Sequence, residues 1–265
     1  MNDQSLGPPL LRHTAAQVAT LTLNRPRQYN ALSADLLAAL HAELDALAAD
    51  ESVRVVLVTG SGNAFCSGHD LREMRALGSR AQVEALFFAC SAMMRKLVTL
   101  PQPVIAVVNG LATAAGCQLV AQCDLAVASR NARFAASGVN LGLFCSTPAV
   151  AISRNLGRKR AAEMLFSGDF IDAETALDWG LVNRVAPPEQ LMEVALDLAN
   201  NLKSKPRAAL ALGKALFYRQ LEQGLEGAYA DASKTIASNM DTDIAREGVD
   251  AFFDKRSPRW DNPKD

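Results

Sequence analysis

The sequence is short of the residues that metal, nucleic-acid and membrane sites require. Its histidines are few and scattered, and it contains no H-E-x-x-H motif, so we predict no metal site. Aromatic residues make up only 6% of the chain and are not interleaved with basic ones, which argues against nucleic-acid binding. No apolar run approaches the ~18 residues of a membrane-spanning helix, so we expect no membrane partner.

The chain also lacks an excess of charge and a disulfide framework. Its 27 basic and 28 acidic residues give a net charge of -1, so a polyanionic ligand would have to be bound by local basic groups. Five cysteines form an odd set without a C-x-x-C pair, which favours reduced thiols. Residues Met1 to Pro9 show no basic and then apolar leader pattern. Together these features predict a cytoplasmic protein.

Two common catalytic motifs are missing. No G-x-S-x-G elbow occurs, so a hydrolase triad has no anchor. The segment from Gly60 to Phe65 nearly matches a dinucleotide-binding fingerprint, but Phe65 stands where a third glycine would let helix and strand pack closely. We therefore predict no nicotinamide cofactor.

Hydrophobic periodicity predicts an α/β fold followed by a helical C-terminal region. With 265 residues, 49% of them hydrophobic, the chain can bury a large core. Apolar strands alternate with amphipathic helices, which is typical of a parallel sheet. Strands are predicted at 18–23, 53–58, 104–108 and 125–128, and helices after Ser33, at 82–97 and up to Gln122. From about Pro187 only helices are predicted, at 189–202, 206–221, 224–239 and 242–253. We divide the chain into a core, residues 1–195, and a helical oligomerisation region, residues 196–265.

Three segments, taken together, resemble the crotonase, or enoyl-CoA hydratase/isomerase, superfamily. They are Leu23-Asn24-Arg25-Pro26 with Asn30-Ala31-Leu32, the run from Gly60 to Leu71, and the run from Val108 to Leu119. The resemblance implies a spiral of ββα units with a helical C-terminal region, assembled as a homotrimer or a dimer of trimers. It also implies an acyl-CoA thioester as substrate, nominally in fatty acid metabolism, and no permanently bound cofactor.

The same resemblance places an oxyanion hole at the backbone amides of His69 and Ala115. Chemistry at the α-carbon of a thioester passes through an enolate, whose oxygen needs hydrogen-bond donors fixed in advance. Ala115 stands where a helix would begin, so the positive end of the helix dipole would also face that oxygen. The imidazole of His69 has two open interpretations: it lines the pocket mouth or meets solvent, or it transfers a proton or contacts pyrophosphate.

Further residues are assigned to substrate or CoA binding by the resemblance. The segment from Arg25 to Ala31 would follow the adenine nucleotide, with Arg72 near phosphate and Lys255 reaching in from the C-terminal helix. Each cation is equally well explained as a solvated surface charge. The full set is Arg25, Gln28, Tyr29, Ala31, Ser67, Gly68, Asp70, Leu71, Arg72, Gly116, Asn140, Cys145 and Lys255.

The chain departs from the hydratase pattern at both catalytic carboxylates. Hydratases of this superfamily carry glutamate at the positions of Gln118 and Gly138. Glutamine can hydrogen-bond but cannot accept and return a proton, and glycine offers only backbone. Because a general acid or base contributes ~10²–10⁴ in rate, we expect little standard hydration. The same segments resemble one subgroup of the superfamily, whose motifs imply no settled reaction.

Several alternatives remain open for the site. One hypothesis is an enzyme that stabilises an enolate, and the other is a non-catalytic acyl-CoA binder or assembly subunit. A different crotonase reaction, with bound water or a small anion as base, is a further possibility, since superfamily members with glycine at the position of Gly138 use bicarbonate. We expect Gln118, Ser137, Gly138 and Asn140 to line the space for it, with Cys145 or Ser146. Cys145 is either a nucleophile or a buried structural thiol.

Overall fold

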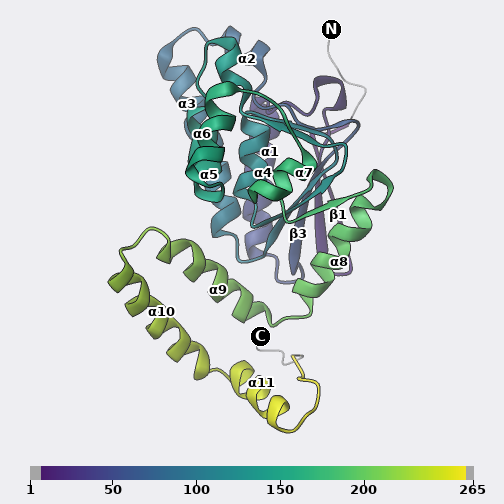
Figure 1. Ribbon diagram of the computed structural model, residues 1–265. Helices are drawn as coiled ribbons and strands as arrows, with labels where there is room; N and C mark the ends of the chain where they lie inside the picture. The colour runs from purple at the N-terminus through teal and green to yellow at the C-terminus, as the bar shows by residue number, and fades with distance from the viewer. Residues whose placement is uncertain (1–6, 261–265) are drawn as a thin grey trace.

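The computed structural model describes residues 7–260 of the chain and shows two sheets wrapped by helices (Figure 1). Residues 1–6, which include most of the segment used to argue against a leader, lie outside the described residues. No helix within the described range is long and apolar enough to cross a membrane.

The larger sheet has six strands and is mostly parallel. Its order is β1 (Leu10–Ala15), β2 (Val18–Leu23), β3 (Val55–Gly60), β5 (Val104–Val108), β7 (Leu125–Ser129) and β10 (Arg184–Ala186). Only the edge pair β1 and β2 is antiparallel, while every later pair is parallel. The predicted strands at 18–23, 104–108 and 125–128 are confirmed, and the one predicted at 53–58 begins at Val55.

A smaller sheet lies at the carboxyl ends of the central strands. It has the order β4 (Ala64–Cys66), β6 (Leu111–Thr113), β8 (Arg133–Ala135) and β9 (Ile171–Asp172). The strands β3, β5 and β7 each pass through a short turn into β4, β6 and β8, respectively. Each repeat thus has one strand in the larger sheet, one in the smaller sheet, and then helical structure. This is the ββα repeat that the family resemblance implies.

Several of the core helices begin at a residue whose side chain caps them. The Ser33 hydroxyl accepts a hydrogen bond from the Leu36 amide at 3.2 Å and caps α1 (Ala34–Ala49). The polar segment after Asp70 is α2 (Leu71–Ala76), and the amides of its second and third residues, Arg72 and Glu73, donate to the Asp70 carboxylate. The remaining core helices are α3 (Arg80–Thr99), α4 (Ala115–Gln122), α5 (Ser146–Asn155), α6 (Arg158–Ser167) and α7 (Ala173–Trp179), with short 3₁₀ turns η1 (Pro26–Gln28), η2 (Ser137–Leu141) and η3 (Pro188–Gln190).

Alternate residues of the central strands bury their side chains on opposite faces of the large sheet. On β5, Val104, Ala106 and Val108 join the core under α1, α3 and α4, while Ile105 and Val107 face α8 (Leu191–Lys203). Leu191, Ala195 and Ala199 of α8 are all buried there. The boundary predicted at residue 195 therefore lies inside α8. Because α8 packs on the sheet, the core defined by packing extends to the end of this helix.

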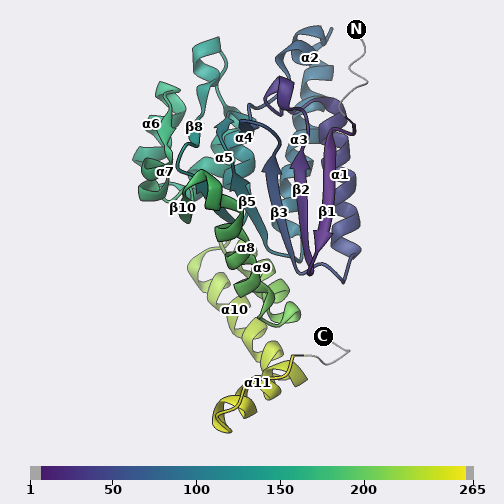
Figure 2. The same ribbon diagram turned by 90° about the vertical axis from the view of Figure 1, so that its right-hand side faces the viewer.

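The C-terminal helices α9 (Arg207–Gln220), α10 (Leu225–Met240) and α11 (Asp243–Phe253) extend away from the two-sheet body (Figures 1 and 2). A nearly buried ion pair fastens α9 to the core. Lys214 Nζ donates to Asp124 Oδ2 at 2.7 Å and to the carbonyls of Leu97 and Gln102, while the Tyr218 hydroxyl donates to Asp124 Oδ1 at 2.8 Å. Every hydrogen of the ammonium group is thus used, which offsets its removal from water.

We predict that Lys214→Met lowers the free energy of unfolding by about 3–5 kcal/mol, because it leaves the Asp124 carboxylate buried without its cation. Chemical denaturation at neutral pH measures the change. Lys159→Met, at an exposed position of α6, is the matched control and should change stability by less than about 0.5 kcal/mol. Equal effects of the two substitutions would show that the Asp124 pair does not hold α9 in place.

Candidate functional site

The loop after β4 is held by a short parallel bridge between Leu32 and His69. The Leu32 amide donates to the Gly68 carbonyl at 2.7 Å, and the Asp70 amide donates to the Leu32 carbonyl at 3.1 Å. Because the bonds use the residues on either side of His69, its own amide points away from this bridge. Among residues 7–260 the His69 amide donates to no acceptor.

This loop lies directly against the start of α4. Gly68 has φ +94°, and a Cβ placed on it would be 3.0 Å from Ala114 Cβ and 3.3 Å from the Ala115 amide nitrogen. A side chain there would be both strained and crowded, so the close approach requires glycine. The next residue of α4, Gly116, abuts the Cys66 carbonyl in the same way. The structure therefore brings the backbone at 66–69 and that at 114–116 into contact.

Helix α4 begins without a side-chain cap. Its N-cap, Ala114, has φ +49° and ψ -118°, a conformation that non-glycine residues rarely adopt. The Ala114 amide donates to the Ala135 carbonyl at 2.9 Å, which fixes the turn, whereas the Ala115 amide donates to no acceptor within residues 7–260. This end of α4 thus presents unpaired amides and the positive end of the helix dipole.

The His69 side chain is partly buried, and its two ring nitrogens are enclosed. Both ring nitrogens are inaccessible to solvent and have no partner among residues 7–260, and the Phe87 ring packs edge-on with a centroid separation of 5.0 Å. Burial lowers the pKa of His69 to about 4, so the ring is neutral at physiological pH. A neutral ring is poorly suited to binding pyrophosphate by charge.

Gln118 lies one turn into α4 and is only 4% exposed. Its Oε1 is buried without a hydrogen-bond partner among the described residues, as is Oε1 of Gln102. Buried amide groups are nearly always paired in folded proteins, so this side chain is an exception.

Around Gly138, the backbone is closed by its own loop. The Gly138 amide donates to Cys145 Sγ at 3.2 Å, and the Leu143 amide donates to the Gly138 carbonyl at 3.0 Å. A Cβ at position 138 would lie 2.6 Å from the Leu143 carbonyl oxygen and 2.8 Å from Cys145 Sγ.

Burial raises the pKa of the Cys145 thiol, and the Gly138 amide offsets only part of that effect. The thiol is therefore protonated at neutral pH, which favours a structural role over a nucleophilic one. The side chain of Asn140, on the same loop, donates to the Gly168 carbonyl at 3.3 Å.

Comparison with known proteins was made on the whole chain. The family profile described as enoyl-CoA hydratase/isomerase matches residues 13–263. The chain belongs to the enoyl-CoA hydratase/isomerase family. It is 46% identical over 254 residues to enoyl-CoA hydratase domain-containing protein 3, mitochondrial, of Rattus norvegicus, covering 95% of this chain and 85% of the relative. That protein represents the subgroup indicated by the segments around Gln118 and Gly138, so the resemblance is confirmed.

Solved structures of the same family confirm the crotonase fold. An enoyl-CoA hydratase from Mycobacterium smegmatis superimposes with a TM-score of 0.94 at 57% identity, covering 96% of this chain and all of that one. Human enoyl-CoA hydratase domain-containing protein 3 gives a TM-score of 0.92 at 42% identity, covering 95% of this chain and all of that one.

The predicted cytoplasmic location is contradicted by the relatives. Vertebrate proteins that are 42–46% identical to this chain are all named as mitochondrial. The prediction was drawn from reduced thiols and the residues at the start of the sequence. Reduced thiols indicate a reducing environment but do not distinguish one such compartment from another.

The predicted CoA-binding segments at 25–31 and 67–72 of this family member also lie side by side. The Ser67 amide donates to the Tyr29 carbonyl at 3.0 Å. Arg25 donates to the Ala31 carbonyl at 2.6 Å and to Asp70 Oδ2 at 3.0 Å, so its guanidinium group joins the two segments. Asp70 is also the cap of α2. These contacts give Arg25 and Asp70 a structural role that the sequence did not indicate.

Other residues predicted to bind CoA lie at the surface, and one lies far from the rest. Leu71 and Arg72 begin α2 with exposed side chains, and Tyr29 is 60% exposed. Gln28 is the last residue of η1. Lys255 follows α11, at the opposite end of the molecule from α2 (Figures 1 and 2). Within one chain, therefore, the structure does not bring Lys255 to the other predicted residues.

Two residues have structural roles here that the sequence did not indicate, Asn30, which lies within the predicted segment 25–31, and Phe87, which was not predicted to have a role. Asn30 is completely buried, accepts from the Arg25 amide and donates to the carbonyls of Ser61 and Ala64. Phe87 covers the His69 ring. Nothing in the local sequence distinguishes Phe87 from an ordinary apolar helix position. The importance of Asn30 could have been predicted from the family motif, in which it is a polar residue between Tyr29 and Ala31. Among residues 7–260, no group of three or more His, Cys, Asp or Glu could hold a metal ion.

The depressed pKa of His69 predicts an acid-dependent loss of stability. In the unfolded chain the His69 imidazole takes up a proton near pH 6.5, whereas in the folded protein it does so only near pH 4. The neutral imidazole therefore contributes fully to stability above pH 6.5. Between pH 6.5 and 4 the unfolded state binds more protons, and about 3 kcal/mol of unfolding free energy should be lost. Urea denaturation of wild type and His69→Gln at several pH values measures it. The difference between the two proteins should change over this range, whereas the exposed control His13→Gln should follow wild type.

Proposed function

We propose that this protein binds an acyl-CoA thioester and places the thioester oxygen between the backbone amides of His69 and Ala115. The observation that carries the proposal is the close approach of the two segments, since a Cβ added to Gly68 would lie 3.3 Å from the Ala115 amide nitrogen. Two amides without acceptors within residues 7–260 lie on segments in contact, and both are fixed by neighbouring backbone hydrogen bonds. Donors fixed in advance stabilise the charge that develops on an oxygen without reorganising.

The proposed reaction is stabilisation of an enolate or a similar oxyanion rather than efficient hydration. Gln118 cannot take up or return a proton, and Gly138 has no side chain. His69 is neutral and enclosed, and the Cys145 thiol is protonated. A base would then have to come from bound water, a small anion or the substrate itself. We therefore expect hydration of crotonyl-CoA to be slower by at least about 10² than in a hydratase with both carboxylates.

A non-catalytic acyl-CoA binder or assembly subunit is the second candidate. The observation that favours it is the closure of position 138, where the Leu143 carbonyl and the Cys145 thiol occupy the space a side chain would need. A carboxylate introduced there would have to displace main chain. The loop is thus built around glycine, as expected where no acid or base is required.

The proposed function is tested by comparing the binding affinity of a thioester with that of an analogue that lacks the carbonyl. We predict that butyryl-CoA binds at least about tenfold more tightly than the S-butyl-CoA thioether, because only the thioester accepts hydrogen bonds from His69 and Ala115. Isothermal titration calorimetry on the full chain measures both affinities. Equal affinities would rule out the oxyanion hole, and no binding of either would rule out an acyl-CoA protein.

The same samples separate the enzyme from the binder. In deuterium oxide, an enolate-forming enzyme incorporates deuterium at the α-carbon of butyryl-CoA faster than buffer does. Binding without any enhancement of exchange would favour the non-catalytic candidate.

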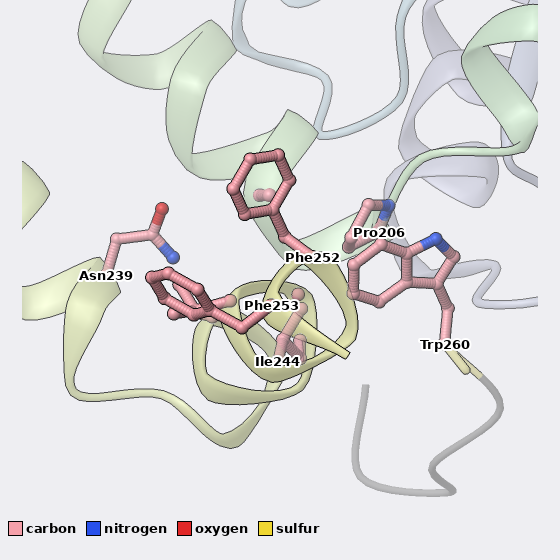
Figure 3. Close-up of a pocket in the computed structure, with 10 residues that line it drawn as sticks. Pro206, Asn239, Ile244, Phe252, Phe253 and Trp260 are labelled. Carbon is pink, nitrogen blue, oxygen red and sulfur yellow. The ribbon is translucent and has the colours of Figure 1, made fainter. Parts of the chain in front are cut away.

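We also propose that the chain forms a homotrimer or a dimer of trimers through its C-terminal helices. Large apolar side chains are exposed along all three of them: Phe217, Leu221, Leu225, Tyr229, Ile236, Met240, Phe252 and Phe253. A cavity of about 480 Å³ lies between Pro206, Ile244, Phe252, Phe253 and Trp260 (Figure 3). An exposed apolar surface of this extent is typical of an interface. Assembly could also bring Lys255 of one subunit to another subunit.

We predict a trimer or hexamer by light scattering after size-exclusion chromatography. Phe252→Glu together with Phe253→Glu should produce smaller species, because charges would be buried in the interface. Phe88→Glu, which is also at a highly exposed phenylalanine but on α3, is the control. A monomeric wild type would contradict the proposal.

A further inference from the structure

Another cavity, of about 430 Å³, lies where successive turns of the spiral pass from the larger sheet into the smaller one. Asn63 lines it from the turn before β4, and Asn109 and Gly110 line it from the turn before β6. Ser129 and Asn131 line it from the end of β7 and the turn that follows. The segments of the candidate site lie at the other ends of β4 and β6. Because these short strands rise about 3.3 Å per residue, the cavity is roughly 10 Å from that site.

Asn109 holds two of these turns together. Its Oδ1 accepts from the Gly60 amide at 3.3 Å, and its Nδ2 donates to the Gly62 carbonyl at 2.9 Å and to the Ala64 carbonyl at 3.3 Å. A Cβ placed on Gly110 would lie 2.1 Å from the Asn63 carbonyl oxygen, so the two turns touch with no side chain between them. The groups that line the cavity are therefore fixed before any ligand arrives, which lowers the cost of binding one.

Two buried hydrogen-bond donors at this cavity have no acceptor. Gly110 is buried, and its amide donates to no acceptor among residues 7–260. The Ser129 side chain is 1% exposed; its hydroxyl accepts from the Asn131 amide at 3.3 Å but donates to no described residue. Buried donors in folded proteins are nearly always paired. Two unpaired donors at one cavity indicate that a hydrogen-bond acceptor occupies it.

The charge at the cavity is positive. Arg133, at the start of β8, lines it, and the described residues contribute no carboxylate to its wall. The Arg133 guanidinium lies over the Phe170 ring, 4.8 Å from its centroid. Nearby carboxylates act elsewhere, since Asp172 caps α7 and Glu174 lies 3.8 Å from Arg130. The cavity is therefore suited to an acceptor that carries negative charge.

The arrangement of the donors matches a phosphate group better than a carboxylate. They come from three separate turns, so they require acceptor atoms in more than one direction. A carboxylate has two oxygens in one plane, whereas a phosphate offers tetrahedral oxygens. Arginine binds phosphate through parallel N–H groups, and a guanidinium that rests on an aromatic ring keeps its edge free for this contact.

We propose that this cavity binds a phosphate group, as inorganic phosphate or as part of a small phosphate ester. Arg133 supplies the charge, and Gly110 and Ser129 supply donors that the fold leaves unpaired. The inference does not rest on the proposed function, because no residue of this cavity is predicted to bind acyl-CoA. The cavity is a second ligand site, joined to the first by β4, β6 and β8.

Isothermal titration calorimetry of the full chain with inorganic phosphate, glycerol 3-phosphate and acetate, at one ionic strength, tests the proposal. Wild type should bind phosphate with a dissociation constant on the order of 1 mM, and acetate at least about tenfold more weakly. Arg133→Gln should weaken phosphate binding by at least about tenfold, because charge-assisted hydrogen bonds are lost. Ser129→Ala, which removes a buried donor with little change in volume, should weaken it about 3- to 10-fold. Binding of glycerol 3-phosphate as well would show that the cavity accepts esters, and its absence would restrict the ligand to free phosphate.

Arg130→Gln is the matched control, because Arg130 is an exposed cation of the same turn that does not line the cavity. It should bind phosphate as wild type does. Arg72→Gln tests whether phosphate binds instead at the position predicted for CoA. The inference is overturned if phosphate does not bind, if acetate binds equally, if Arg133→Gln leaves the affinity unchanged, or if only Arg72→Gln abolishes it. None of these results changes the outcome of the thioester titration, which tests the proposed function separately.

Discussion

The site depends on one close contact, in which the backbone after β4 touches the start of α4 with no side chain between them. Gly68 makes this possible because its φ of +94° and its distance to Ala114 exclude a Cβ. Bonds from Leu32 and Asp70 hold one side, and the bond from Ala114 to Ala135 holds the other. The ββα repeat supplies these two segments from successive turns of the spiral, which explains how amides 46 residues apart in sequence come to lie on touching segments.

Three residues predicted to line the site, His69, Gly138 and Cys145, supply no charged side chain at neutral pH. Position 138 is closed by the Leu143 carbonyl and the Cys145 thiol, and the His69 ring lies against Phe87 with both nitrogens enclosed. The closed space at position 138 and the enclosed nitrogens of His69 both favour uncharged groups. Proton transfer would instead need a group that can gain or lose a proton. These groups are therefore poorly suited to exchanging protons at neutral pH.

Sequence patterns predicted what local forces determine. The leucines after Ser33 and the apolar run at 104–108 specify a helix and a strand by periodicity alone, and both form. The strands β4, β6 and β8 were missed because three residues carry no periodicity and are ordered by pairing with each other. At the site, the roles that motifs assign to His69 and Ala115 stay predictions. The ion pair between Arg25 and Asp70 joins residues 45 apart, and no local pattern specifies it.

The identity of residue 118 has a physical consequence beyond the loss of a catalytic group. Near the positive end of α4 a carboxylate would be stabilised in its charged form, whereas glutamine is neutral and leaves the helix dipole uncompensated. Gln118 is buried and its Oε1 has no partner among the described residues, so the free energy of this amide depends on whether another group reaches it. The substitution therefore replaces a group that can exchange a proton with one that only hydrogen-bonds, and it lies outside the backbone contact between residues 66–69 and 114–116.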